Sequence, residues 1–169
     1  MNAPTGDTAA VTITSTDPVR VYVARDHAAR MEPQFIGPVV GPLFQKLSAA
    51  LRGAGITPDL PAIAWYVPRG AAEQGVEVNA SFAAPDDAPL GPVAGQEFEV
   101  VELPAVEQAA VLVHHGPPDS LGKGYMTLFG WVSREGWVPP GPCREVYLSP
   151  DSVPQAEWVT ELQLPVTRG

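Results

Sequence analysis

The segment GPLFQKLSAALRGAG at residues 41–55 decides the fold, because GKGYMTLFGWVSREG at residues 122–136 repeats its apolar spacing. Aligning Gly55 with Gly136 gives an offset of 81 residues between the two segments. Further residues match at the same offset on either side, and such a fixed period indicates an internal duplication. The matched pairs are Phe44 with Tyr125, Leu47 with Leu128, Leu51 with Val132, Gly55 with Gly136, Pro58 with Pro139, Tyr66 with Tyr147 and Val78 with Val159.

Both segments have the pattern of an amphipathic helix, with apolar residues every three or four positions. The first predicts a helix over about 38–53 that ends at the glycines 53 and 55. The second predicts a helix over about 119–135, with Asp119 or Ser120 as its N-cap and Gly136 as its stop. The apolar stripes are Val40, Leu43, Phe44, Leu47 and Leu51 in the first copy, and Leu121, Tyr125, Leu128 and Val132 in the second.

Short runs rich in β-branched and aromatic residues flank each helix and predict strands. The order is strand, helix, strand, strand, and it occurs twice. The predicted fold is therefore α+β, with two helices on one face of a largely antiparallel sheet and a ligand cleft where the copies meet. We expect a single domain over 1–169, with repeat one at about 17–84 and repeat two at about 96–167. The predicted strands are 19–24, 62–67 and 75–83 in the first copy, 106–114, 144–148 and 158–166 in the second, and 97–103 between them.

Composition limits the classes of partner. With 45% hydrophobic and 17% charged residues the chain is globular. A net charge of −9, with ten Lys and Arg residues spread along the chain, argues against direct nucleic-acid binding and favours cationic ligands. The residues before the first predicted strand are too few for a DNA-binding helix-turn-helix, so we expect any control of transcription to need another DNA-binding chain.

The cysteine and histidine content gives no sign of a metal site or cofactor. Cys143 is the only cysteine, which excludes an intramolecular disulfide and a multi-cysteine zinc site and favours a cytoplasmic location. His114 and His115 point to opposite faces of a strand and are poor partners for one metal ion. The chain has neither a secretory signal pattern nor a membrane-spanning apolar run, so we expect no membrane partner.

Strand alternation makes Glu145 the main candidate for a functional acid. If Val146 and Leu148 pack under the helix, Glu145 and Tyr147 point to the opposite face, toward the expected cleft. Ala64 is then the counterpart of Glu145 in the first copy and leaves room for a ligand. The alternative is that Glu145 lies on a solvated face and that the nearby aromatic residues are simply core.

The second half of the chain resembles the gyrase-inhibitor-like (GyrI-like) ligand-binding domains. The resemblance rests on REVYLSP at 144–150, WVTELQLPV at 158–166, and HHGP at 114–117 leading into the helix with Tyr125 and Trp131. This family includes the effector-binding domains of multidrug-sensing transcription activators and stand-alone relatives. The first copy matches it only through the repeat and residues 62–66.

The resemblance implies a cavity walled by aromatic residues, with an acid on one strand and cationic lipophilic molecules as ligands. Matched residue by residue, Glu145 is the central acid. Phe35 and Tyr22 are weaker assignments, because the first copy departs more from the pattern. The implied wall residues are Tyr147, Tyr125, Trp131 and Tyr66.

The sequence leaves three functions open. The leading interpretation is a stand-alone protein that binds small amphipathic molecules, cationic or aromatic, around Glu145. The second is a hydrolase of small reactive electrophiles, which some relatives are thought to be, with Glu145 and Tyr147 or Tyr66 as its catalytic residues. The third is an inhibitory protein that sequesters a basic protein partner through its acidic surface.

Overall fold

The structure is a computed structural model, and it describes residues 11–71 and 74–168. The chain divides into two compact units. We call Pro18–Pro104 the α1 unit, and Met1–Asp17 together with Ala105–Gly169 the α2 unit. Within the described ranges no helix is both long and apolar enough to cross a membrane.

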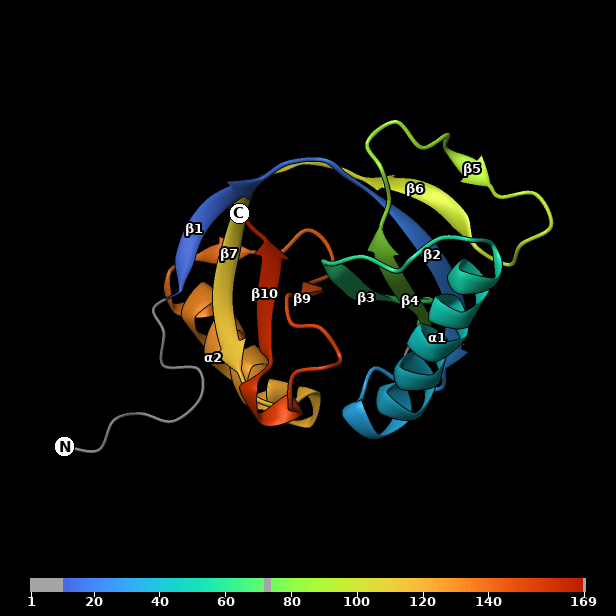
Figure 1. Ribbon diagram of the computed structural model, residues 1–169. Coiled ribbons are helices and arrows are strands. Elements are labelled where there is room, and N and C mark those ends of the chain that lie inside the picture. The colour runs from blue at the N-terminus through green and yellow to red at the C-terminus, as the bar shows by residue number, and fades with distance from the viewer. Residues whose placement is uncertain (1–10, 72–73, 169) are drawn as a thin grey trace. The chain divides into compact units, whose positions relative to one another are not determined.

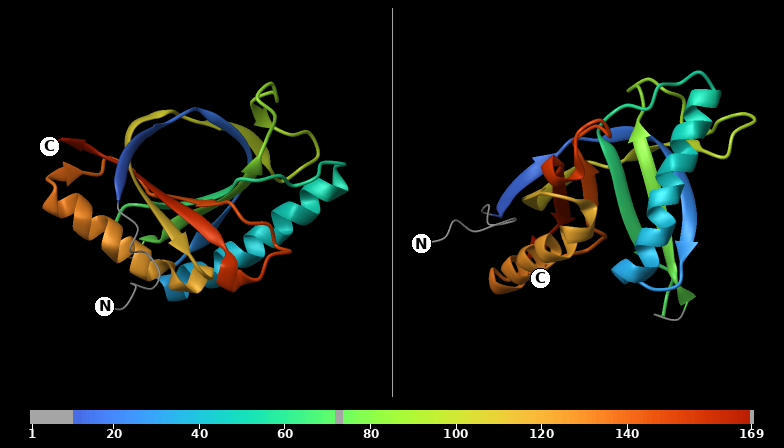
Figure 2. Two further views of the ribbon diagram at one scale, coloured as in Figure 1. Left: turned by 60° about the vertical axis from the view of Figure 1, so that its left-hand side comes forward. Right: turned by 60° about the horizontal axis from the view of Figure 1, so that its bottom comes forward.

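The α1 unit is an antiparallel sheet with one helix. Its strands are hydrogen-bonded in the order β3-β4-β2-β6-β5, and α1 packs against β2 and β4 (Figure 2). Its elements are β2 (Val19–Ala28), α1 (Pro33–Gly53), β3 (Ala62–Pro68), β4 (Val76–Ala83), β5 (Gly91–Pro92) and β6 (Glu99–Leu103).

The α2 unit has the same kind of architecture. Its main strands are hydrogen-bonded in the order β1-β7-β10-β9, all antiparallel, and α2 packs against β7 and β10 (Figure 1). Two short strands, β8 and β11, pair separately. Its elements are β1 (Thr12–Thr16), β7 (Val106–His115), α2 (Leu121–Arg134), β8 (Trp137–Val138), β9 (Arg144–Tyr147), β10 (Val159–Pro165) and β11 (Thr167–Arg168).

Apart from the short β8 that follows α2, both units have the predicted order of strand, helix, strand, strand. In the α1 unit β2 pairs with β4, which pairs with β3, and in the α2 unit β7 pairs with β10, which pairs with β9. The α+β class with antiparallel strands is therefore confirmed. The origin of this shared order by duplication, and the bounds of the two repeats, stay predictions.

The match of Val78 with Val159 is wrong. Tyr66 lies opposite Val78, but Tyr147 lies opposite Thr160 and not opposite Val159. The loop between β9 and β10 is thus one residue longer than the offset of 81 allows. A loop absorbs an insertion easily, whereas a one-residue slip within a strand would turn every side chain to the other face.

The helices differ from their predicted bounds mainly at the N-terminus. Helix α1 begins at Pro33, five residues before the predicted start at 38. The apolar stripe does not reach its first turn, but proline fits there because the N–H it lacks has no partner inside a helix. Gly55 and Gly136, with φ of 79° and 77°, follow the two helix ends as predicted.

Several strands depend on partners that the local sequence does not reveal. Strand β2 continues to Ala28, four residues beyond its predicted end, through its pairing with β4. Strand β1 was not predicted, and neither were β5, β8 and β11. These are short or exposed segments whose extended conformation comes from hydrogen bonds to another strand and not from their own apolar pattern.

Two glycines, one inside α2 and one just after its end, provide a test of local backbone requirements. Gly136→Ala should lower the free energy of unfolding by about 1 kcal/mol, because its positive φ disfavours any side chain. Gly122→Ala should raise it by about 0.5–1 kcal/mol, since its backbone is helical and an added Cβ would have no atom within 4 Å. Urea unfolding of both variants measures the difference, and a stabilising Gly136→Ala would contradict this reading of the helix end.

Candidate functional site

Glu145 lies in β9 and is buried, with 5% of its surface exposed. The alternative of a solvated strand face is therefore wrong. The predicted side of the strand is also wrong. Glu145 is opposite Leu162, which belongs to the core cluster of Leu121, Leu128 and Val132 from α2.

The α2 helix therefore covers the face that carries Glu145 and Tyr147, while Leu148, which was predicted to pack beneath it, is exposed. The α1 unit departs from the prediction in the same way. Ala62 lies opposite Phe82, whose ring contacts Phe44 of α1, so the helix lies over Ala64 and Tyr66 and not over Trp65 and Val67. Strand alternation predicts which residues share a face but not which face the helix covers, because β9 has buried residues on both faces and β3 has the buried Ile63 on the face away from α1.

Two tyrosines from different elements hold the Glu145 carboxylate. The Tyr147 hydroxyl donates a hydrogen bond to Oε1 at 2.6 Å, and the Tyr125 hydroxyl of α2 donates to Oε2. An ionised carboxylate only accepts hydrogen bonds, and hydrogen bonds to the charged form favour it over the neutral acid. The site thus combines a buried acid with two phenol donors, one on each carboxylate oxygen.

Two further aromatic rings adjoin these tyrosines, and neither is among the site residues predicted from the sequence. Phe129 stacks on Tyr125, with ring centroids 6.1 Å apart, and Trp158 meets Tyr147 edge-on at 6.5 Å. Phe129 is four residues after Tyr125 on α2, a spacing that brings side chains together on a helix and was visible in the sequence. Trp158 precedes β10 and has no such local signal.

Burial also shifts the pKa values of Cys143 and Arg144, which precede Glu145 in the chain. Burial, followed by the nearby charge of Glu145, raises the pKa of the Cys143 thiol. The thiol therefore stays protonated near neutral pH and is a packing group, as the sequence indicates. Burial lowers the pKa of Arg144, which points to the opposite strand face from Glu145.

The remaining predicted wall residues have different surroundings. Trp131 is half-buried against the core beneath α2. In the α1 unit, Tyr22 packs edge-on against Phe98 at 5.8 Å, Phe35 lies exposed in the first turn of α1, and Tyr66 is buried in β3. Their contact with a ligand stays a prediction.

His114, near the end of β7, contacts the residue at the start of α2. Its Nε2 lies 2.7 Å from Ser120 Oγ, which donates a hydrogen bond to the Pro117 carbonyl oxygen at 2.7 Å. Ser120 is the N-cap residue of α2, yet its side chain does not cap the helix. No cluster of three or more potential metal ligands occurs in residues 11–71 and 74–168.

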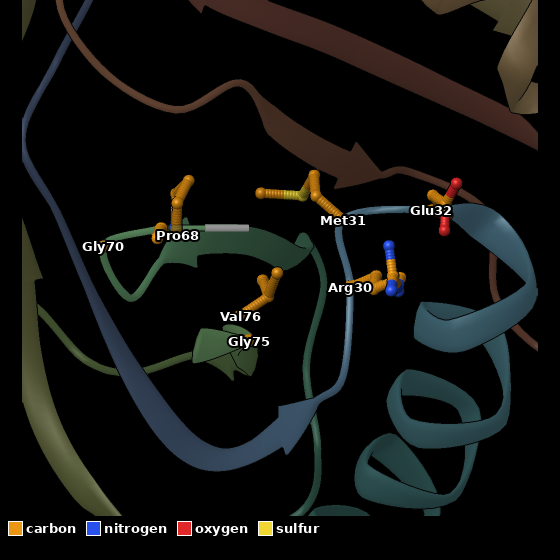
Figure 3. Close-up of a pocket in the computed structure, with 8 residues that line it drawn as sticks. Arg30, Met31, Glu32, Pro68, Gly70, Gly75 and Val76 are labelled. Atoms are coloured by element: carbon orange, nitrogen blue, oxygen red, sulfur yellow. The ribbon is translucent and has the colours of Figure 1, made fainter. Parts of the chain in front are cut away.

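The α1 unit contains two shallow hollows that do not involve the predicted site residues. One, of about 240 Å³, is lined by Arg30, Glu32 and Val76, among others, and Figure 3 shows the Met31 side chain extending toward Pro68 at its edge. The other, of about 270 Å³, lies between α1 and β2 beside Phe98. The first has no aromatic lining, and the second has the single ring of Phe98, so neither combines an acid with several rings.

The α+β architecture and the buried acid among tyrosines agree with the match to a known family. The model of the GyrI-like small-molecule binding domain matches residues 11–167. The chain belongs to this family. A search of curated proteins finds no match.

Several solved structures share the fold. The C-terminal domain of EcmrR is 24% identical, with a TM-score of 0.69 over 95% of this chain and 98% of that one. EcmrR in a complex with DNA is 25% identical, with a TM-score of 0.68 over 95% of this chain and 58% of that one. SAV2435 bound to tetraphenylphosphonium is 11% identical, with a TM-score of 0.67 over 94% of each chain.

Proposed function

We propose that this GyrI-like protein binds aromatic or lipophilic cations at Glu145, with Tyr125 and Tyr147 beside the charge. The observation that carries the proposal is the buried carboxylate with a phenol hydroxyl on each oxygen. The likeness in fold to SAV2435, whose structure contains tetraphenylphosphonium, supports this class of ligand.

The energetics of this acid favour a cationic ligand. Removing a carboxylate from water costs several kcal/mol, on the order of magnitude found for buried ions, and the two phenol groups that donate to Glu145 carry no positive charge. A cation brought near Glu145 adds a favourable charge interaction. Aromatic faces attract the same cation by about 0.5–2 kcal/mol each and require no fixed ligand shape. The rings of Tyr125 and Tyr147, extended by Phe129 and Trp158, provide such faces.

Comparing a cation with its neutral analogue distinguishes a site that selects positively charged ligands from one that binds any apolar ligand. We expect purified protein to bind tetraphenylphosphonium at least about tenfold more tightly than triphenylphosphine oxide, because only the first carries a charge for Glu145. Isothermal titration calorimetry measures both. Equal affinities would show that the carboxylate does not select the ligand.

Hydrolysis of a reactive electrophile is the second candidate, and the Tyr147–Glu145 hydrogen bond of 2.6 Å favours it. Glu145 would accept a proton from a water molecule as that water attacks the electrophile, and Tyr147 would return a proton to the leaving group. Both carboxylate oxygens already accept phenol hydrogens, however, so an attacking water would compete with these hydrogen bonds for Glu145. Binding therefore accounts better for this arrangement, and mass spectrometry of an electrophile incubated with the protein separates the two functions.

A further inference from the structure

The hydroxyl of Thr160 is unusual among the polar side chains beneath α2. Thr160 is fully buried, with 0% of its surface exposed. Its Oγ1 has no hydrogen-bond partner among the protein groups of the described residues. Buried hydroxyls are nearly always paired, because leaving one unpaired costs free energy. Valine has almost the same shape without that cost, so packing alone does not explain a threonine here.

Thr160 lies next to the Glu145 site on the same face of the sheet. It is directly opposite Tyr147 on β9 and His114 on β7. Glu145 is the diagonal neighbour of Thr160. The Cα atoms of diagonal neighbours in an antiparallel pair are roughly 7–8 Å apart, which is about the width of a fused ring system. A ligand ring at Glu145 therefore reaches Thr160 when the Tyr147 ring turns aside.

The groups beside Thr160 already direct their hydrogens elsewhere. Tyr147 donates its hydroxyl hydrogen to Glu145. Ser120 donates to the Pro117 carbonyl, so the hydrogen between His114 and Ser120 belongs to His114 Nε2 and points at the Ser120 oxygen. The arrangement leaves the Thr160 hydroxyl as a polar group next to the acid that can donate one hydrogen bond and accept others.

We propose that Thr160 is a ligand-binding residue that hydrogen-bonds an amino or hydroxyl group of the bound cation. The inference rests on the proposed function of Glu145 and narrows its ligand class. The preferred ligands are aromatic cations with a hydrogen-bonding substituent about the width of a fused ring system from the charge. A cation with no such group, like tetraphenylphosphonium, uses Glu145 and the aromatic rings but not Thr160.

A matched pair of probes tests this. Ethidium is an aromatic cation with two amino groups, and 5-ethyl-6-phenylphenanthridinium has the same ring system without them. Thr160→Val should raise the dissociation constant of ethidium about five- to tenfold, the value of one hydrogen bond, and that of the second probe less than about twofold. Thr160→Ser keeps the hydroxyl and should bind ethidium within about twofold of the unaltered protein.

The stability of the ligand-free protein gives an independent readout. Thr160→Val should unfold at the same temperature as the unaltered protein or higher, because it removes an unpaired hydroxyl. A lower unfolding temperature with unchanged ethidium binding would assign the hydroxyl to an internal water and overturn the proposal. Thr160→Ala removes the same hydroxyl and replaces the valine variant if that variant does not fold.

The remaining outcomes are also decisive. If Thr160→Val weakens the binding of both probes equally, the effect is one of packing and the role in hydrogen bonding is overturned. If it changes the binding of neither probe, that role is also overturned. If neither probe binds the unaltered protein, the proposed function fails together with this inference. If both bind through Glu145 but ignore Thr160, only this inference fails.

Discussion

Glu145→Gln should weaken the binding of tetraphenylphosphonium by about 30-fold or more. Glutamine keeps the size of the side chain and one acceptor oxygen but removes the charge. Loss of one partner of a desolvated charge pair costs about 2 kcal/mol or more, which corresponds to this change in the dissociation constant. The amide nitrogen would also face one of the two phenol hydroxyls that now donate to the carboxylate. Calorimetric titration of the folded variant measures the effect.

Glu161→Gln is the matched control for this experiment. Glu161 is also on a strand of the α2 unit, but it lies opposite Val146 and so points to the other face from Glu145. Its replacement lowers the net negative charge by the same amount and leaves the site intact. We expect less than about a twofold change in affinity, because a charge outside the site acts mainly through a screened long-range field. Comparable losses in the two variants would attribute binding to overall charge and remove Glu145 from its central role.

Leu128→Ala should lower the free energy of unfolding by about 2–5 kcal/mol. Leu128 is fully buried between α2 and the sheet, where it contacts the cluster that includes Leu112 and Leu162. The truncation removes apolar contacts and leaves a cavity that the surrounding strands cannot fill. Since domains of this size are stable by only about 5–15 kcal/mol, the variant should show a clear shift in urea unfolding.

Met126→Ala on the same helix provides the comparison. Met126 is 79% exposed, so its replacement should change the free energy of unfolding by no more than about 0.5 kcal/mol. Both substitutions place alanine in α2, so helix propensity differs little between them. A loss at Met126 as large as that at Leu128 would mean that the exposed face of α2 is covered in the native protein.

The periodicity of the sequence was sufficient to predict the main helices and strands. Leu47 and Leu51 of α1, and Leu128 and Val132 of α2, are buried at the predicted helical spacing. The helices could be predicted because a helix that packs on a sheet must present one apolar stripe, and the spacing of apolar residues along the chain defines that stripe. The edge strand β1 was missed because its residues are largely exposed and its conformation depends on pairing with β7.

The acid was also predicted, but its surroundings were not. Alternation placed Glu145 and Tyr147 on one strand face, and the structure has them hydrogen-bonded on that face. Alternation does not say which face a helix covers when both faces are buried, as in β9. The side of the sheet, and with it the hydrogen bond from Tyr125, therefore needed the folded chain.

The 81-residue offset predicts the order of the elements but not the register of β9 against β10. By itself the sequence determined the order of elements, the helical stripes and the identity of the acid, because these depend on local spacing and residue chemistry. Only the tertiary structure decided that Thr160, and not Val159, lies opposite Tyr147, and that α2 covers Glu145. Register and the choice of covered face are settled by hydrogen bonds and packing between segments distant in the chain, which no local pattern contains.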